Sequence, residues 1–425
     1  MNPITKLFYL FRRCWKAIRL FLILSGPGLV VMIADNDAGG ITTYAATGAK
    51  YGCSFIWVLV LLVPVAYYVQ EMTVRLGAVT KRGHAQAIFE NFGNFWGWFS
   101  LTDLVFCDWL TLITEFIGMT AAMGIFGVPP WITCIGVILL MLFMVLNGRY
   151  WTWEKITMLF CLLNLIYIPA AFWVNPSASD VVHGFLPNLP GGKWDNQFFF
   201  FIMANIGTTI APWMIFFQQS AVVDKGMTEK DIPFGKFDTL LGSILTVIVA
   251  IFIIIVVGTV LPGVDIDDAA QASKMLMGNA EHGYAGVFMA IGLFDAGLLG
   301  AICISLASSW ALGEIFGWAH SLNNRIKEAP WFYAVYLLAL ITAASVVLIP
   351  GAPLVIITLF VQVIAVTLLP AALVFLLLLL NDKEIMGKYT NNLFENIINV
   401  GIVSVIVVLS TLYAVSTLFP DMFGN

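Results

Sequence analysis

Long runs of apolar residues dominate this sequence and restrict how the chain can fold. The runs Leu240–Leu261 and Leu354–Leu380 each exceed the roughly 20 residues that an α-helix needs to cross a bilayer. Membrane β-strands would instead alternate in hydrophobicity over about ten residues, which these continuous runs do not do. Charged residues make up 11% of the 425 residues, against about 25% in a typical soluble domain. The sequence therefore predicts an all-α integral membrane protein.

Eleven segments have the length and apolar character of membrane-spanning helices. They cover residues 21–47, 53–78, 96–124, 129–147, 156–174, 197–223, 236–261, 285–318, 332–349, 353–380 and 395–419. With the N-terminus in the cytoplasm, Lys50, Lys193 and Lys274 are the only ones of the 20 Lys and Arg residues that fall outside. Positive residues concentrate on the cytoplasmic side of membrane proteins, so this distribution supports the eleven-span topology. We expect a plasma or bacterial inner membrane protein with a cytoplasmic N-terminus and an external C-terminus.

The segment 1–20 carries five Lys and Arg residues before an apolar run, as a signal peptide does. We find no small-residue cleavage site before the run continues into a full span, so this segment is expected to remain as a cytoplasmic extension.

Two of the predicted spans are interrupted at mid-depth in the same way. Span 1 begins with Gly26-Pro27-Gly28 and is broken at Asp35–Gly40, and span 6 is broken at Asn205–Pro212. Matched interruptions five spans apart are typical of transporters built from two inverted repeats, which bind substrate where the helices unwind. Ordinary Pro or Gly kinks are the alternative, but Asp37 inside a span costs roughly 3 kcal/mol on insertion scales unless it has a role. We therefore predict five-helix repeats over 21–174 and 197–380, followed by an additional helix and external C-terminus over 381–425.

These motifs resemble the NRAMP family of divalent metal transporters, which have the fold of LeuT-type secondary transporters. The family has Asp-Pro-Gly-Asn where this chain has Asp37-Ala38-Gly39-Gly40, and Met-Pro-His-Asn where it has Ala211-Pro212-Trp213-Met214. Further matches lie at Glu115–Gly118, Ala290–Gly297 and Gln362–Pro370, so the resemblance covers most of residues 26–380. It implies divalent metal ions and the lipid bilayer as partners, with no nucleic acid, and we expect a monomer.

The departures from the family pattern concern the metal ligands. In the family the ion is held by the Asp and Asn of span 1, by the Met sulfur of span 6 and by backbone carbonyls. Here Asp37 keeps the carboxylate, whereas Gly40 replaces the Asn and Ala211 replaces the Met. These losses remove the soft ligand that favours transition metals and leave oxygen donors. Mg²⁺ keeps several waters and binds through one or two carboxylates, so the departures resemble the NRAMP-related magnesium transporters.

The resemblance also implies that the backbone carbonyls of Ala34 and Thr208 line the site. Gln362 in span 10 either donates its side-chain oxygen to the hydration shell of the ion or makes a helix-to-helix hydrogen bond. We expect import of largely hydrated Mg²⁺ by alternating access, with Mn²⁺ left open as a second substrate and with no cofactor.

The proton-transfer residues of the family are replaced as well. Its coupling acid in span 3 aligns with Leu112, and its two span 6 histidines align with Trp213 and Gln218. None of these side chains titrates near neutral pH. An uncoupled uniporter is therefore expected, because moving two charges through 100 mV is worth about 4.6 kcal/mol, or roughly three decades of accumulation.

Several other polar residues each have two interpretations. Asp35 either contributes to the ion site or makes a structural contact. Asp108 and Glu115, on one face of span 3, either line a cation or proton route or make interhelical hydrogen bonds. Met214 either restores a sulfur ligand or fills apolar space. The acidic loop Asp265–Glu281 either concentrates cations at the mouth of the protein or is simply solvated.

Other functions remain as alternatives. The first is a proton-coupled Mn²⁺ or Fe²⁺ transporter of the same family, and the second is a transporter of organic solutes. A non-transporting membrane receptor or scaffold represents a different class. An enzyme is not expected, because we find no nucleophile and base pair, phosphate loop or metal-histidine motif.

Overall fold

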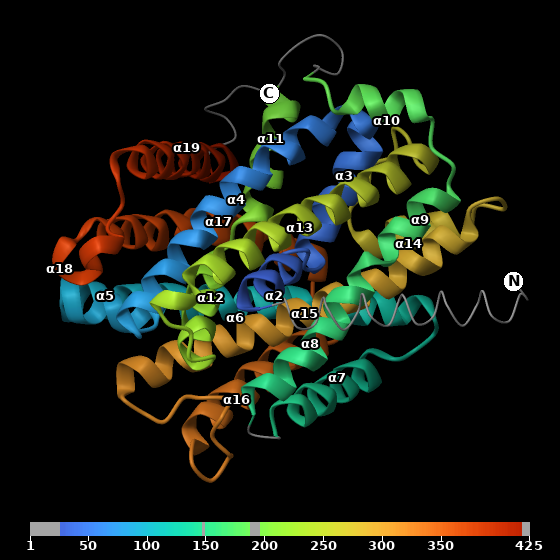
Figure 1. Cartoon of the computed structure of the whole chain (residues 1–425). Coiled ribbons are helices and arrows are strands. Elements are labelled where there is room, and N and C mark those ends of the chain that lie inside the picture. Colours follow the sequence, from blue (N-terminus) through green and yellow to red (C-terminus); the bar gives the residue numbers. More distant parts are fainter. Residues whose placement is uncertain (1–25, 147–148, 188–195, 419–425) are drawn as a thin grey trace, which may run out of the picture.

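The computed structural model describes residues 26–146, 149–187 and 196–418, and every regular element in these ranges is a helix. The predicted cytoplasmic segment 1–20, the first residues of span 1 and Lys193 lie outside the described residues. Figure 1 shows long helices that cross one another in a bundle, with short helices at its edges.

The described residues of the predicted first repeat form eight α-helices. They are α2 (Pro27–Ala34), α3 (Ala38–Tyr51), α4 (Ile56–Thr80), α5 (His84–Phe92), α6 (Asn94–Ile125), α7 (Pro130–Val145), α8 (Tyr150–Leu163) and α9 (Tyr167–Trp173). Short 3-10 helices at Gly52–Phe55 and Asn164–Ile166 precede α4 and α9.

The remaining helices follow a short connecting helix, α10 (Ala178–Gly184). They are α11 (Asn196–Thr209), α12 (Pro212–Asp224), α13 (Ile232–Val260), α14 (Ala269–Met277), α15 (Gly283–Phe316), α16 (Pro330–Val347), α17 (Leu354–Asn381), α18 (Lys383–Met386) and α19 (Leu393–Leu418). Two more 3-10 helices lie at Glu229–Asp231 and Gly387–Tyr389.

Eight helical segments of the described chain are long and apolar enough to cross a membrane. They support an integral membrane protein, while the count of eleven crossings stays a prediction. Helices α5, α10 and α14 were not predicted, and they lie in the connections between spans. The start of α14 is fixed by a local contact, because the Asp268 carboxylate accepts a hydrogen bond from the Gln271 backbone N–H at 2.7 Å.

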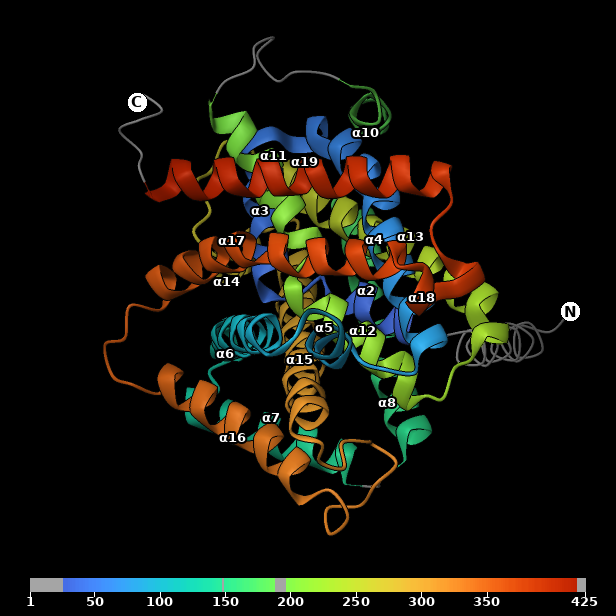
Figure 2. The same ribbon diagram turned by 90° about the vertical axis from the view of Figure 1, so that its left-hand side faces the viewer.

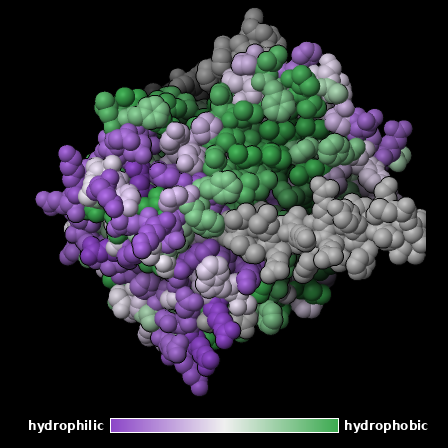
Figure 3. Space-filling model, viewed as in Figure 1, coloured by the Kyte–Doolittle hydropathy of each residue, from purple (hydrophilic) through white to green (hydrophobic). Residues whose placement is uncertain are grey.

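The helices form a layered bundle. In Figure 2, α6 and α15 lie between α17 and α19 on one side and α7 and α16 on the other. The core contacts join α6 to α15 and join α13 to α2, α3 and α4. In Figure 3, hydrophobic residues form a broad patch across the middle of one face, with hydrophilic residues gathered on either side of it. This banding is expected of a protein whose waist lies in lipid.

The structure breaks two helices at the positions that the sequence predicts. Residues 35–37 separate α2 from α3, and residues 210–211 separate α11 from α12. Both breaks lie inside the bundle, where Asn36 and Ile210 are at most 1% exposed. The interrupted backbone is therefore buried in protein, as irregular structure within a membrane must be unless it lines a cavity.

Asp238 of α13 fixes the position of α2. Its carboxylate accepts hydrogen bonds from the backbone N–H groups of Gly26 at 2.7 Å, Gly28 at 2.8 Å and Leu29 at 3.2 Å. These groups belong to the first turn of α2, whose N–H groups have no partner within the helix. A Cβ atom on Gly28 would collide with Thr239 and Asp238, so close packing explains the glycine.

We expect Asp238→Ala to destabilise the protein strongly, because it leaves three buried N–H donors without an acceptor. Losses of about 1–3 kcal/mol for each unsatisfied donor lead us to expect a decrease of about 3–5 kcal/mol in the free energy of unfolding. Thermal unfolding of the purified variants measures the effect. Asp382→Ala is the control, because the exposed Asp382 caps α18 through the Glu384 backbone N–H, and loss of a cap costs about 1 kcal/mol. Equal melting of the two variants would contradict the role assigned to Asp238.

Candidate metal site

Asp37 begins α3 at the first break. Its carboxylate accepts a hydrogen bond from the Gly40 backbone N–H at 2.7 Å and thereby caps the helix. The site position Gly40 therefore contributes an N–H to the orientation of Asp37. A Cβ atom on Gly40 would lie 3.2 Å from the Asp35 backbone carbonyl and 3.4 Å from the Asp37 Oδ1 atom, so the glycine permits close packing here. Capping leaves lone pairs of the carboxylate for an ion, so capping and metal binding are compatible.

The three consecutive residues 35–37 lie at this break, and their side chains have different surroundings. The Asn36 side-chain amide donates to the Thr246 backbone carbonyl of α13 at 3.3 Å. Asp37 lies on the side of α6 and α15, where a Cβ on Gly300 would meet both Asp37 and Glu115. Asp35 is 1% exposed, and its Oδ2 atom has no hydrogen-bond partner among the described residues.

Glu115 of α6 supports the same break. Its Oε2 atom accepts a hydrogen bond from the Ala38 backbone N–H at 3.0 Å, and the residue is fully buried. This interhelical contact agrees with the second of the two interpretations given above for Glu115. Two carboxylates, Asp37 and Glu115, therefore occupy the N-terminal end of α3, where the helix dipole favours negative charge.

The second break supplies a thioether and backbone groups. The Met214 sulfur accepts a hydrogen bond from the Ala211 backbone N–H at 3.3 Å, so this sulfur is directed toward the break. Thr208, in the last turn of α11, is 9% exposed, and its hydroxyl donates to the Asn205 carbonyl. The two interpretations of Met214 given above left this orientation open, because it depends on the local fold around Pro212.

Four helix ends therefore border the two breaks. The C-terminal ends of α2 and α11 present backbone carbonyls, and the N-terminal ends of α3 and α12 present N–H groups. Ala34 is the last residue of α2 and Thr208 lies in the last turn of α11. Their carbonyls stand where helices carry partial negative charge, which favours a cation.

The remaining residues predicted to bear on transport have different surroundings. Gln362 falls within α17, but its side chain lies outside the described part of the structure. Leu112 and Trp213 are buried in apolar surroundings. The Gln218 side-chain amide donates to the Thr239 hydroxyl at 2.9 Å, which ties α12 to α13.

Other buried acids make interhelical contacts away from the breaks. Asp108 accepts a hydrogen bond from the Ser308 hydroxyl at 2.6 Å, and Asp295 accepts one from the Asn164 amide at 3.4 Å. Within the described ranges, no three His, Cys, Asp or Glu side chains converge in a geometry that holds a metal ion. The candidate site is therefore built from few side chains and from backbone oxygens.

A cavity of about 360 Å³ reaches the first break from one end of the bundle. It is lined by Ala38 and Gly39 of α3, by polar residues of α3 and α6, and by Asp267 and Asp268 beside α14. Part of the acidic loop thus borders a cavity that reaches the break, and both interpretations of this loop stay open. The positive-inside rule predicts that this end is external.

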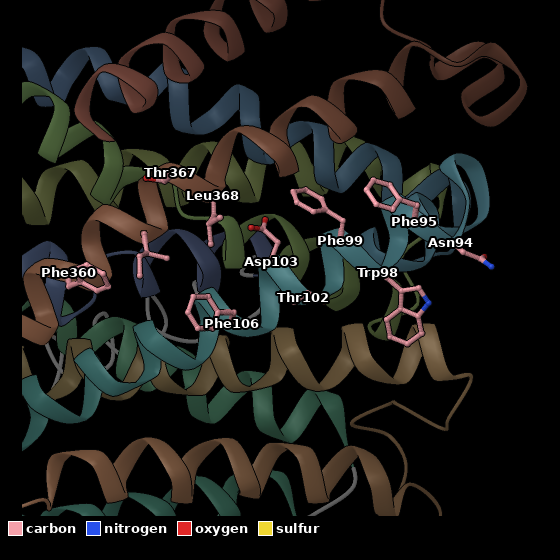
Figure 4. Close-up of a pocket in the computed structure, with 11 residues that line it drawn as sticks. Asn94, Phe95, Trp98, Phe99, Thr102, Asp103, Phe106, Phe360, Thr367 and Leu368 are labelled. Carbon is pink, nitrogen blue, oxygen red and sulfur yellow. The ribbon is translucent and has the colours of Figure 1, made fainter. Parts of the chain in front are cut away.

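A second cavity, of about 830 Å³, lies between α6 and α17. It is lined mostly by aromatic and aliphatic side chains, and Figure 4 shows Phe99 and Asp103 of α6 facing the space beside Leu368 of α17. A hydrated ion needs polar partners along its path. The apolar lining therefore makes this cavity a poor route for ions, and it is separate from the two breaks.

Comparison with known proteins places this arrangement in a family. The family described as "Natural resistance-associated macrophage protein-like" matches residues 28–416. A natural resistance-associated macrophage protein 2 homologue of Dictyostelium discoideum is 25% identical over 96% of the chain, which spans 65% of that relative's length. The divalent metal cation transporter MntH of Staphylococcus saprophyticus is 26% identical over 95% of the chain and 94% of its own length.

Solved structures show that the fold is shared. The Eremococcus coleocola manganese transporter, in complex with an aromatic bis-isothiourea substituted compound, has a TM-score of 0.79 at 20% identity, covering 97% of this chain and 89% of that one. The structure of MhsT in complex with L-phenylalanine has a TM-score of 0.62 at 13% identity, covering 92% and 98%. These likenesses confirm the expected LeuT-like helical fold.

Members of the matching family transport metal ions, which confirms the expectation that the chain is not an enzyme. The family match extends over most of the chain and includes both helix breaks. The chain therefore belongs to the Nramp family of divalent metal transporters.

Proposed function

We propose that the protein imports Mg²⁺, largely hydrated, through a site at the two helix breaks. This proposal rests on the oxygen donors that lie at the two breaks. Asp37, the carbonyls of Ala34 and Thr208, and the backbone of Ala211 offer hard oxygen donors, and Gly40 adds no side-chain ligand. A site with few side-chain ligands suits an ion that retains several waters.

The names of the relatives favour the alternative, a Mn²⁺ or Fe²⁺ transporter, over the magnesium proposal. One similar structure is a manganese transporter, and several relatives are named divalent metal cation transporters. The Met214 sulfur at the second break also favours the Mn²⁺ or Fe²⁺ alternative, because a thioether prefers softer metals. Manganese transport is therefore our second candidate, and the two differ in whether Met214 contacts the ion.

The ion is proposed to move without proton coupling. Leu112, Trp213 and Gln218 stand where the proton-transfer groups of the family are expected, and none of them exchanges protons near neutral pH. The membrane potential alone supplies the driving force for a divalent cation.

Alternating access is proposed to operate on eleven membrane spans. The cavity beside Asp267 and Asp268 reaches α3, whereas α2 is buried along its whole length and held by Asp238. This asymmetry supports a conformation with access from the predicted external side.

Asp37→Ala is expected to abolish Mg²⁺ influx, because it removes the carboxylate that caps α3 at the first break. Proteoliposomes that contain a Mg²⁺ indicator, under a negative-inside potential, measure this influx. Asp295→Asn is the control, because Asp295 is also a buried acid but lies away from the breaks, beside Asn164. Uptake should proceed without acidification of the lumen, and Mg²⁺ influx that persists in Asp37→Ala would contradict the assigned site.

Restoring the ligands of the family should change the selectivity. The double substitution Gly40→Asn and Ala211→Met supplies an amide and a thioether, so we expect the ratio of Mn²⁺ to Mg²⁺ influx to rise by about tenfold or more, which corresponds to about 1.4 kcal/mol. Met214→Leu removes the sulfur that is already present. If the protein is a magnesium transporter, we expect this variant to keep its Mg²⁺ influx. Loss of Mn²⁺ influx in Met214→Leu would instead favour the second candidate.

Gly300→Ala should weaken divalent binding. A Cβ at this position would lie 2.9 Å from the Glu115 Oε2 atom and 3.2 Å from the Asp37 Cβ atom, so the Glu115 carboxylate must move. We expect the half-saturating Mg²⁺ concentration to rise about tenfold, as expected for about 1.4 kcal/mol. Gly124→Ala on α6, whose Cβ would have no atom within 4 Å, is the control and should behave like the wild type.

A further inference from the structure

We propose that the cavity between α6 and α17 binds an amphipathic organic cation, a molecule with a substituted ammonium group and an apolar body. The site lies away from the two helix breaks and is separate from the transport of metal ions. Its two recognition elements are the carboxylate of Asp103 and the aromatic rings that line the same cavity (Figure 4).

One face of α6 and one face of α17 supply the lining. On α6 the lining residues recur at helical spacing and therefore share one side of the helix; they include Phe95, Trp98, Phe99, Thr102, Asp103 and Phe106. Phe360, Ile364 and Leu368 of α17 follow the same spacing on the opposite wall. From Phe95 to Phe106 the cavity follows α6 for about 17 Å, at about 1.5 Å per residue. It thus extends well beyond the interfacial belt in which aromatic side chains usually anchor a membrane protein.

Asp103 is the one charged residue among the lining residues that the structure describes. It lies nine positions after the first residue of α6, a helix of membrane-spanning length, and its side chain is half-buried. None of the ion pairs within the described ranges involves Asp103. An aspartate inside a membrane span is costly and usually pairs with a partner or serves a function. Figure 4 shows its carboxylate directed into the cavity, which leaves it available to a positively charged occupant.

The aromatic lining suits an ammonium group rather than a metal ion. The rings belong to Phe95, Trp98, Phe99 and Phe106 of α6 and to Phe360 of α17. The negative face of an aromatic ring attracts a cation, and this attraction grows where water is excluded. Aromatic rings therefore recognise substituted ammonium ions, whereas Mg²⁺ requires several oxygen ligands.

Neighbouring rings hold two of these side chains in place. Trp98 packs edge-to-face against Phe89 and Phe316, with ring centroids 6.2 Å and 5.6 Å apart. Phe99 packs edge-to-face against Trp96 at 5.9 Å. The rings are therefore positioned before a ligand arrives, which lowers the entropic cost of binding.

The size and exposure of the cavity indicate what enters it and from where. Its volume of about 830 Å³ is in the range of cavities that bind small organic molecules. Phe95 is 72% exposed and Phe360 is 61% exposed, in helices that we expect to lie in the membrane. A ligand with an apolar body therefore reaches the cavity from the bilayer. A phospholipid is less suitable, because its headgroup would bring a phosphate close to Asp103, where like charges repel.

Binding of a tritiated probe to the full chain in phosphatidylcholine nanodiscs tests the proposal. The probe is decyltrimethylammonium, and the competitor is the uncharged hydrocarbon in which carbon replaces the nitrogen. We expect Asp103→Asn, which keeps the shape of the side chain, to raise the Kd about tenfold or more, and Asp103→Glu to recover most of the affinity. Phe99→Leu removes a ring but keeps an apolar side chain, so we expect the Kd to rise about threefold.

Two substitutions outside the cavity are the matched controls. Asp295→Asn changes a buried acid beside Asn164, and Phe172→Leu changes a ring that is 75% exposed. Both should bind the probe as the wild type does. The melting temperature gives a second readout, because a ligand that binds the folded protein stabilises it. The probe should raise the melting temperature of the wild type more than that of Asp103→Asn.

Three results would overturn the proposal. Absence of saturable binding above that of empty nanodiscs would show that the cavity does not take the ammonium ion. An unchanged Kd in Asp103→Asn would show that the carboxylate has no part in binding. Equal displacement of the probe by the uncharged competitor would show that the cavity accepts any apolar chain, a lipid acyl chain included. Binding is measured without transport, so the result does not depend on which metal ion the protein moves.

Discussion

The break between α2 and α3 is the feature on which the rest of the molecule depends. Unwound backbone inside a membrane must find partners within the protein, and here the partners come from several helices. Glu115 accepts from the Ala38 N–H, Asn36 donates to α13, and Asp238 holds the first turn of α2. The core contacts of α6, α13 and α15 therefore fix the orientation of Asp37.

The same constraint creates the electrostatic character of the site. Interrupting two helices brings carbonyl ends and N–H ends together at one depth, and the carboxylates of Asp37 and Glu115 occupy the N-terminal end of α3. Asp35 is a further buried acid at the same break. A region with this much negative charge, and with no ion pair to these acids among the described residues, is arranged to receive a cation.

The sequence predicted the helical membrane class and the two breaks because both have strong local causes. These causes are the long apolar runs, the Gly-Pro-Gly motif and an aspartate inside a span. Each of them determines the structure of only a few neighbouring residues. The direction of a side chain is decided by packing, so the sequence left the orientation of Met214 open until the neighbouring helix break was in place. Short helices such as α14 depend on a single cap and were missed for the same reason. The choice between Mg²⁺ and Mn²⁺ depends on small differences in ligand geometry, which residue identity alone does not fix.

The central claim is that the breaks form a site for a hard, hydrated divalent ion. Its most direct test is influx from an equimolar mixture of Mg²⁺ and Mn²⁺ into the same wild-type proteoliposomes, with both metals counted by mass spectrometry. The account predicts that Mg²⁺ accumulates at a rate at least equal to that of Mn²⁺. Accumulation of Mn²⁺ with Mg²⁺ excluded would contradict it and would assign the Met214 sulfur to the metal.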